Sequence, residues 1–151
     1  MKLEYSTVAR CRPEDIWAVF TDSTRWSEWS SLLAGVQWTS GEPWTPGSQG
    51  VIELAQPAFK LKSTMKEALP PQRIVWAGAV MGVNFECAFR FTPEASGITP
   101  DAATTLMHAA IDLSGPAVFF INDDMKKKGM AAFTPWFDAL KAQAEKLSAT
   151  P

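Results

Sequence analysis

The spacing of apolar residues changes once along this chain, and that change limits the folds available to it. As far as Leu113, apolar and polar residues alternate through several short segments, as in strands with one buried face. From Ser114 onward, apolar residues recur every three or four positions, which is the period of a helix. Because a sheet with one apolar face must cover it, the pattern predicts an α+β fold in which an antiparallel sheet packs on a long C-terminal helix.

Six or seven strands are predicted before that change. The clearest is "VNFECAFRF" (83–91), which places Val83, Phe85, Cys87, Phe89 and Phe91 on one face. Further strands are expected at 2–10, 36–38, 51–54, 59–66, 73–80 and 104–113. The Pro-, Gly- and Ser-rich residues 92–102 predict a loop.

Two short helices are predicted between the first two strands, in "RPEDIWAVFTDSTRWSEWS" (12–30). Pro13 suits a first helical position, which predicts a helix over 13–21. A second helix opens at the capping residues 22–24 and closes at Gly35, so that Trp26, Trp29 and Leu33 share a face. We therefore expect the tryptophans of this stretch to fasten the helices to the sheet rather than to form an exposed stacking platform.

The C-terminal helix is expected to begin at Ser114, a good cap, with Pro116 in its first turn. Pro135 cannot lie in an unbroken helix without kinking it. The pattern leaves two alternatives open, a bent helix or two helices that meet near Thr134.

Size and composition exclude several classes of protein. A chain of 151 residues predicts a single domain over 1–151. With a net charge of −2, the chain has no global field that favours nucleic acid, and no segment has the length needed to cross a membrane. The two distant cysteines, Cys11 and Cys87, and the polar N-terminus predict a cytoplasmic protein with reduced thiols.

Three segments together resemble the START-like, or SRPBCC, superfamily. They are "RPEDIWAVFTDSTRWSEW", "TPGSQGVIEL" and "PPQRIVWAG", which occur in the superfamily's order along the whole chain. Within it, the chain is most similar to the polyketide cyclase/dehydrase and lipid-transport branch. It departs from the pattern at Arg12, a poor helix cap, and at Pro135 in the final helix. The resemblance implies a helix-grip fold: a curved seven-stranded antiparallel sheet around a long C-terminal helix, with two short helices between strands 1 and 2.

The resemblance also implies an internal cavity between the sheet and the C-terminal helix, although a solid core without a cavity is the alternative. Apolar and methionine side chains on the inferred inner faces suit an adaptable apolar pocket. The residues expected to line it are Trp29, Phe59, Leu61, Ser63, Met65, Trp76, Phe85, Cys87, Phe89, Met107, Ile111, Met125, Phe133 and Phe137.

No catalytic constellation is recognisable. The single histidine, His108, is expected to face solvent, about 13 Å from Asp112 on the same strand. Glu53 is a candidate acid or base only if it faces inward, and Cys87 is expected to be a small buried hydrophobe. Two cysteines and one histidine on separate elements offer no metal-ligand spacing, phosphate-binding motifs are absent, and the sequence predicts no cofactor. The run Lys126–Lys128 is expected to be a solvated helix face.

Three functions remain open at this point. The first is the binding of a small hydrophobic or amphipathic molecule, such as a lipid, an isoprenoid or a polyketide-like aromatic. The second is a cyclase or dehydratase that uses the same cavity, and the third is a protein-interaction or stress-regulation module with a partner at the loop around Trp44. We expect no nucleic-acid partner and no stable insertion into a membrane.

Overall fold

The sheet is antiparallel, with seven strands in the order β1-β7-β6-β5-β4-β3-β2. The computed structural model describes residues 1–55, 58–94 and 103–149. The strands are β1 (Lys2–Ala9), β2 (Leu33–Ser40), β3 (Gln49–Ala55), β4 (Ala58–Leu69), β5 (Arg73–Val80), β6 (Val83–Glu94) and β7 (Thr104–Ser114). The helices are α1 (Pro13–Thr21), α2 (Trp26–Trp29) and α3 (Asp123–Ser148), with short 3-10 helices η1 (Ser23–Arg25) and η2 (Val118–Phe120).

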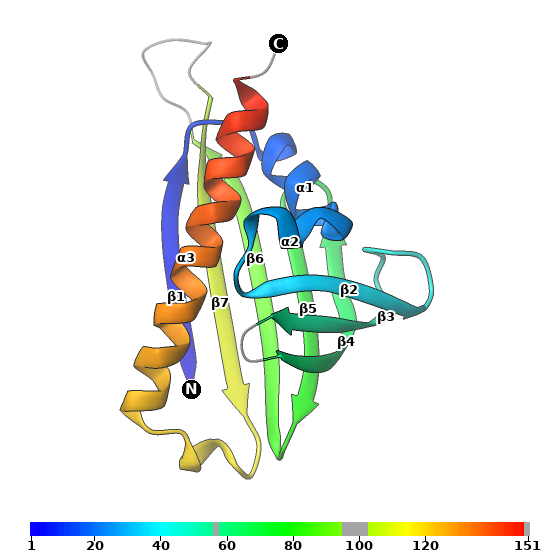
Figure 1. The fold of residues 1–151 in the computed structure, drawn as a ribbon, viewed down its shortest axis with the longest axis vertical. Helices are drawn as coiled ribbons and strands as arrows, with labels where there is room; N and C mark the ends of the chain where they lie inside the picture. The colour runs from blue at the N-terminus through cyan, green and yellow to red at the C-terminus, as the bar shows by residue number, and fades with distance from the viewer. Residues whose placement is uncertain (56–57, 95–102, 150–151) are drawn as a thin grey trace.

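The arrangement confirms the α+β helix-grip prediction. Helix α3 lies along the sheet, and α1 and α2 lie at one end of it, beside the C-terminal end of α3 (Figure 1). The opposite end carries the turn between β5 and β6 and the connection from β7 to α3 (Figure 1). The loop predicted at 92–102 cannot begin at residue 92, because β6 continues to Glu94. The rest of that loop, residues 95–102, lies outside the described residues.

The second short helix differs from the prediction. It is a single turn that ends at Trp29, and Leu33 and Gly35 belong to β2. The chain leaves the helix at Ser30, whose hydroxyl accepts hydrogen bonds from the backbone N–H groups of Leu32 and Leu33 at 3.2 and 2.9 Å. A serine side chain that satisfies two backbone donors favours a turn over another helical turn.

The prediction for the start of α3 was also wrong. Strand β7 continues through Ser114, and the helix begins only at Asp123. Its cap is Asn122, whose side-chain oxygen accepts the Met125 N–H at 2.8 Å. The helix then continues to Ser148 with Pro135 inside it, so the alternative of two helices is wrong. One residue before that proline, the Thr134 hydroxyl donates a hydrogen bond to the Met130 carbonyl at 3.0 Å.

Polar contacts hold the C-terminal half of α3 to β1. The Tyr5 hydroxyl donates to the Asp138 carboxylate at 2.8 Å, and the Glu145 carboxylate accepts the Arg10 backbone N–H at 2.7 Å. The two hydrogen bonds lie at the middle of β1 and just past its C-terminal end, so they fix the second half of the strand to the helix. Among the described residues, the polar contacts between β1 and α3 all lie beyond Pro135, at Asp138, Lys141 and Glu145.

Helix α1 carries the residue around which the core is built. Phe20 is fully buried, and its ring lies within 6.0 Å of six other aromatic rings. These rings come from α2, the loop before β3, β5, β6 and α3; they are Trp26, Trp44, Trp76, Phe89, Phe91 and Trp136. Trp26 is itself fully buried against Phe20 and Trp44, so it packs into the core and is not part of an exposed stacking platform.

Candidate functional site

The face of the sheet that α3 covers divides into two halves. Cross-strand pairs share a face, so the registers Trp76 with Cys87 and Cys87 with Ile111 identify one row of inner-face side chains. Next to it, toward α1 and α2, lies a row that includes Ile74 and Phe89, which are at most 2% exposed. That end of the inner face is a closed, solid core.

The other end of the inner face is only partly covered. Its side chains are apolar and half-buried, and we call them the uncovered half: Val80, Val83, Cys87, Ile111 and Leu113. Phe85, on the same face, is buried. In the N-terminal part of α3, a Cβ added to Gly129 would meet nothing within 4 Å. Apolar side chains and open space therefore coincide at the end of the sheet remote from α1.

Large apolar side chains also lie exposed at this end. Met81, at the turn between β5 and β6, is 86% exposed, and Phe119 and Phe120 on η2 are 74% and 70% exposed. The two segments are joined by a 3.0 Å hydrogen bond from the Ala117 N–H to the Gly82 carbonyl. The connection after β7 therefore holds this apolar tip beside the uncovered half.

The residues expected to line a cavity fall into three groups. Eight are buried: Ser63, Met65, Trp76, Phe85, Phe89, Met107, Phe133 and Phe137. Four are half-buried: Trp29, Leu61, Cys87 and Ile111. Phe59 and Met125 are 38% and 50% exposed, so their role in lining a ligand site stays a prediction. Phe59 lies near the end of the β3–β4 pair, and Met125 lies in the first turn of α3, where little packs over them.

The enclosed space near Trp76 is very small. It has a volume of about 10 Å³ and is bordered by residues of β2 to β5, among them Trp38, Met65 and Trp76, and by Trp44 of the loop before β3. One water molecule needs about this much room, whereas small-molecule sites occupy roughly 300–1,000 Å³. The large aromatic side chains thus fill this part of the interior, which is bordered by strands and a loop; the cavity that the sequence resemblance predicts lies between the sheet and the C-terminal helix.

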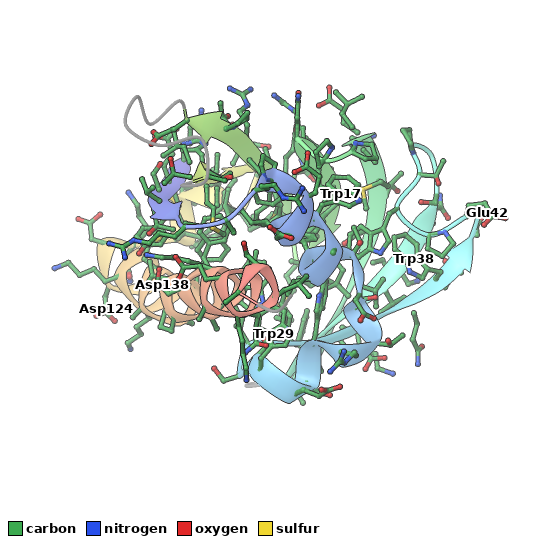
Figure 2. All side chains as sticks on the ribbon, turned by 90° about the horizontal axis from the view of Figure 1, so that it is seen from above. Trp17, Trp29, Trp38, Glu42, Asp124 and Asp138 are labelled. Atoms are coloured by element: carbon green, nitrogen blue, oxygen red, sulfur yellow. The ribbon has the colours of Figure 1, made fainter. Side chains whose placement is uncertain are left out.

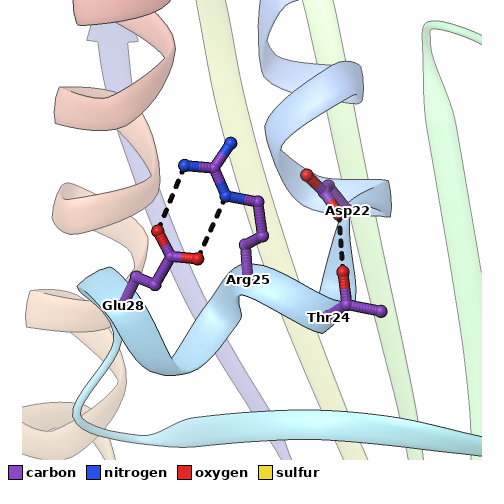
Figure 3. A network of polar contacts seen from close by, with 4 residues as sticks. All are labelled: Asp22, Thr24, Arg25 and Glu28. Carbon is purple, nitrogen blue, oxygen red and sulfur yellow. Dashed lines mark hydrogen bonds and ion pairs between the residues drawn. The ribbon is translucent and has the colours of Figure 1, made fainter.

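A larger hollow lies on the surface between α1, α2 and the end of α3. Its volume is about 550 Å³, and its walls include Val19, Trp29 and Leu147. Figure 2 shows Trp29 lying between α2 and α3, and its ring stacks on that of Trp136 at a centroid distance of 6.4 Å. The rim is polar: the Arg25 guanidinium bonds both oxygens of Glu28, at 3.0 and 3.1 Å (Figure 3).

That ion pair fixes the charge of its members. The hydrogen bonds from Arg25 lower the pKa of the Glu28 carboxyl below its ordinary value, and those to Glu28 raise the pKa of Arg25. Beside it, the Thr24 hydroxyl donates to the Asp22 carboxylate at 3.0 Å (Figure 3). Arg25 and Glu28 therefore neutralise each other, and the Asp22 carboxylate is held by the neutral Thr24 hydroxyl at the turn between α1 and α2.

The candidate catalytic groups do not converge. Glu53 lies opposite Lys60 on the outer face of the sheet, and His108 lies there too, between Ser6 and Arg90. Cys87 faces inward, but burial raises the pKa of its thiol to about 12, although Trp76 donates a hydrogen bond to it. Burial likewise raises the pKa of Cys11 to about 12. Both thiols are therefore protonated and poorly nucleophilic at neutral pH.

Within the described parts of the chain, no group of three or more His, Cys, Asp or Glu side chains could hold a metal ion. None of the helices described there is both long and apolar enough to cross a membrane.

The sequence did not point to several residues of this region. Val80, Val83 and Leu113 were placed on strands but not in the site, and Trp136 was assigned only to the apolar stripe of α3. Strand parity was a usable signal for the first three, because each belongs to the same face as Cys87 or Ile111. Strand parity does not show how far each side chain lies from the helices that cover the sheet.

Comparison with known proteins places the sequence in one family. The profile of the family described as "Polyketide cyclase / dehydrase and lipid transport" matches residues 1–145. No curated protein sequence matches the chain.

Solved structures share the fold at low sequence identity. A START superfamily protein from Mycobacterium smegmatis is 15% identical with a TM-score of 0.70, and the match covers 97% of this chain and 98% of that one. A protein from Nitrosomonas europaea is 13% identical with a TM-score of 0.72, covering 99% and 97%. The di-domain ARO/CYC StfQ from the steffimycin biosynthetic pathway is 14% identical with a TM-score of 0.71, covering 99% of this chain and 52% of that one.

Proposed function

We propose that this chain, which belongs to the polyketide cyclase/dehydrase and lipid-transport family, binds a small hydrophobic or amphipathic molecule against the uncovered half of its sheet. One observation carries the proposal: the inner face is fully buried near α1 but only half-buried at Val80, Val83, Cys87, Ile111 and Leu113. A ligand bound over these side chains buries the apolar surface that α3 leaves partly exposed.

The hydrophobic effect supplies the affinity at such a surface. Each apolar side chain that passes from exposed to buried contributes about 1.5–3 kcal/mol at full burial, and a half-buried one contributes part of that. Met125 and Met130, on the neighbouring turns of α3, have flexible thioether side chains that adapt to ligands of different shape. The ligand takes the open side of the inner face, since the enclosed space near Trp76 is only about 10 Å³.

Binding is favoured over cyclase chemistry by the placement of the ionisable groups. A cyclase needs at least one group that moves a proton at the ligand. Glu53 and His108 lie on the outer face, and the inward thiol of Cys87 has a pKa of about 12. The family description includes cyclases and dehydrases, and turnover assays with aromatic polyketide precursors test that second candidate separately.

Titration with N-phenyl-1-naphthylamine, a neutral dye that fluoresces in apolar surroundings, tests the proposal. The wild-type chain is expected to bind the dye, and Ile111→Gln is expected to weaken binding about tenfold, because a polar amide replaces an apolar contact. His108→Gln is the matched control, since His108 lies on the outer face of the same strand.

Equal dye binding by Ile111→Gln, His108→Gln and the wild type would place the ligand elsewhere. Failure of the wild type to bind the dye at micromolar concentration would contradict the proposal itself.

A further inference from the structure

Two arginines lie directly opposite each other on the outer face of the sheet. Arg73 of β5 pairs with Arg90 of β6, and Arg90 pairs in turn with His108 of β7, so the three side chains share that face. The Phe91 N–H donates to the Gln72 carbonyl at 2.8 Å. The adjacent pair of arginines is therefore of the non-hydrogen-bonded type, in which the Cα atoms are about 4.5 Å apart and the side chains are closest. Like charges in such positions destabilise a sheet, so an added negative charge is favourable here.

The charge of this cluster is only partly balanced. A carboxylate oxygen of Glu67 on β4 lies 2.6 Å from Nε of Arg73. Arg90 is exposed, and no carboxylate among the described residues forms an ion pair with it. Two positive charges thus face one negative charge, and the half-buried His108 beside Arg90 adds a further positive charge when it is protonated. The cluster keeps an excess of positive charge.

A hollow of about 310 Å³ lies beside the two arginines, between the turn from β4 to β5 and the end of β6. We call it the arginine hollow. Gln72 and Thr92 border it with an amide and a hydroxyl, which are neutral hydrogen-bond donors. Leu69, 57% exposed, gives it an apolar wall. Small-molecule sites occupy roughly 300–1,000 Å³, so the hollow fits a small anion that carries an organic group.

The pairing of two guanidinium groups selects the kind of anion. A guanidinium donates two parallel hydrogen bonds to a carboxylate or a phosphate. A carboxylate has two oxygens and one charge, so a single arginine satisfies it. A phosphate monoester has three free oxygens and a charge of about −1.5 to −2 at pH 7, which two arginines can share. Arg73 and Arg90 side by side therefore favour a phosphate monoester.

We propose that Arg73 and Arg90 bind the phosphate group of a small phosphate monoester on the outer face of the sheet. Gln72 and Thr92 donate further hydrogen bonds to the phosphate oxygens, and Leu69 contacts the organic part of the ligand. This site lies on the face opposite to the uncovered half, so it is independent of the proposed function.

Titration of ¹⁵N-labelled protein with phenyl phosphate at low ionic strength tests the inference. The amide signals of residues 69–73 and 90–92 are expected to shift saturably, with a dissociation constant below about 1 mM. Arg90→Gln is expected to weaken binding about tenfold or more, because it removes charge-assisted hydrogen bonds to the phosphate.

Arg25→Gln is the matched control. It makes the same change of net charge, but Arg25 is paired with Glu28 and borders a different hollow, the one between α1, α2 and the end of α3. It is expected to bind phenyl phosphate as the wild type does. Arg90→Gln is also expected to keep the binding of N-phenyl-1-naphthylamine, which shows that the variant is folded and separates this site from the uncovered half.

Two further probes test the class of ligand. Inorganic phosphate lacks the organic group that contacts Leu69, and benzoate replaces the phosphate by a carboxylate. Both are expected to bind the wild type at least about threefold more weakly than phenyl phosphate does.

The possible contrary outcomes differ in what they overturn. Absence of saturable shifts at millimolar phenyl phosphate, or equal weakening by Arg90→Gln and Arg25→Gln, would contradict the site itself. Inorganic phosphate that binds as tightly as phenyl phosphate would overturn the organic ester, and benzoate that binds more tightly would overturn the phosphate. None of these results changes the binding of N-phenyl-1-naphthylamine, on which the proposed function is tested separately.

Discussion

Thr105 is wholly buried where β7 begins, and its hydroxyl donates to the Cys11 carbonyl at 2.7 Å. This bond ties the segment before α1 to the start of β7. Thr105→Val keeps the shape of the side chain but leaves the carbonyl without this donor. We expect the free energy of unfolding to fall by about 1–3 kcal/mol, measured by urea denaturation.

Thr104→Val is the control for that substitution. Its hydroxyl makes a longer, exposed bond of 3.3 Å to the Glu94 carbonyl. A change within about 0.5 kcal/mol is expected there. Equal effects of the two substitutions on the free energy of unfolding would show that the buried hydrogen bond contributes no extra stability.

The thiols provide a second prediction at the scale of single residues. Burial raises the pKa of Cys11 and of Cys87 from 9.0 to about 12. At about pH 8, the thiolate fraction is therefore roughly a thousandfold smaller than in an exposed cysteine, and alkylation by iodoacetamide slows accordingly. The measurement is the alkylation rate by mass spectrometry, with the urea-unfolded chain as control. Native alkylation at the unfolded rate would contradict the raised pKa of both thiols.

The same shifts give the pH dependence of stability its sign. The unfolded chain loses these protons near pH 9, whereas the folded chain keeps them up to about pH 12. Since the unfolded state then binds fewer protons, the contribution of the thiols to the free energy of unfolding falls as the pH rises from about 9 to 12.

Two glycines lie in contrasting surroundings: Gly129 in a loosely packed part of α3, and Gly78 in a tightly packed part of β5. A Cβ on Gly129 of α3 meets nothing within 4 Å, so Gly129→Ala is expected to stabilise the chain by about 0.5–1 kcal/mol through helix propensity. A Cβ on Gly78 of β5 collides with the Lys62 carbonyl and the Phe85 ring. Gly78→Ala is therefore expected to destabilise the chain, and urea denaturation of both variants measures the contrast. A loss of stability in Gly129→Ala would show that α3 packs closely there.

Element types were predictable from the sequence, whereas the position of their ends was less so. The period-two pattern predicted six or seven strands, because the strands of this sheet have one face toward the core. The start of α3 was misplaced because Ser114 and Pro116 are good helix-start residues that here follow the end of β7. The true cap, Asn122, is equally good, and the choice between them depends on how far β7 pairs with β6.

At the scale of the whole molecule, the candidate site was predictable from the sequence only in part. Strand parity identified which side chains face α3, including Cys87 and Ile111. Strand parity did not show that the space near Trp76 is closed, because that depends on how the Trp44 ring packs against Phe20 and Trp76. Trp44 is thus part of the core, although its loop was a candidate partner-binding segment.

Isoleucine methyl groups report on both halves of the inner face at once. Ile111 is half-buried in the uncovered half, whereas Ile16 and Ile74 are 0% exposed in the closed core. The most direct test of hydrophobic binding on the uncovered half is therefore methyl NMR of ¹³C-isoleucine-labelled protein during titration with N-phenyl-1-naphthylamine. We predict saturable shifts of the Ile111 methyl signal, with those of Ile16 and Ile74 little changed. An unchanged Ile111 signal at saturating probe, or larger shifts at Ile16 and Ile74, would contradict the proposed site.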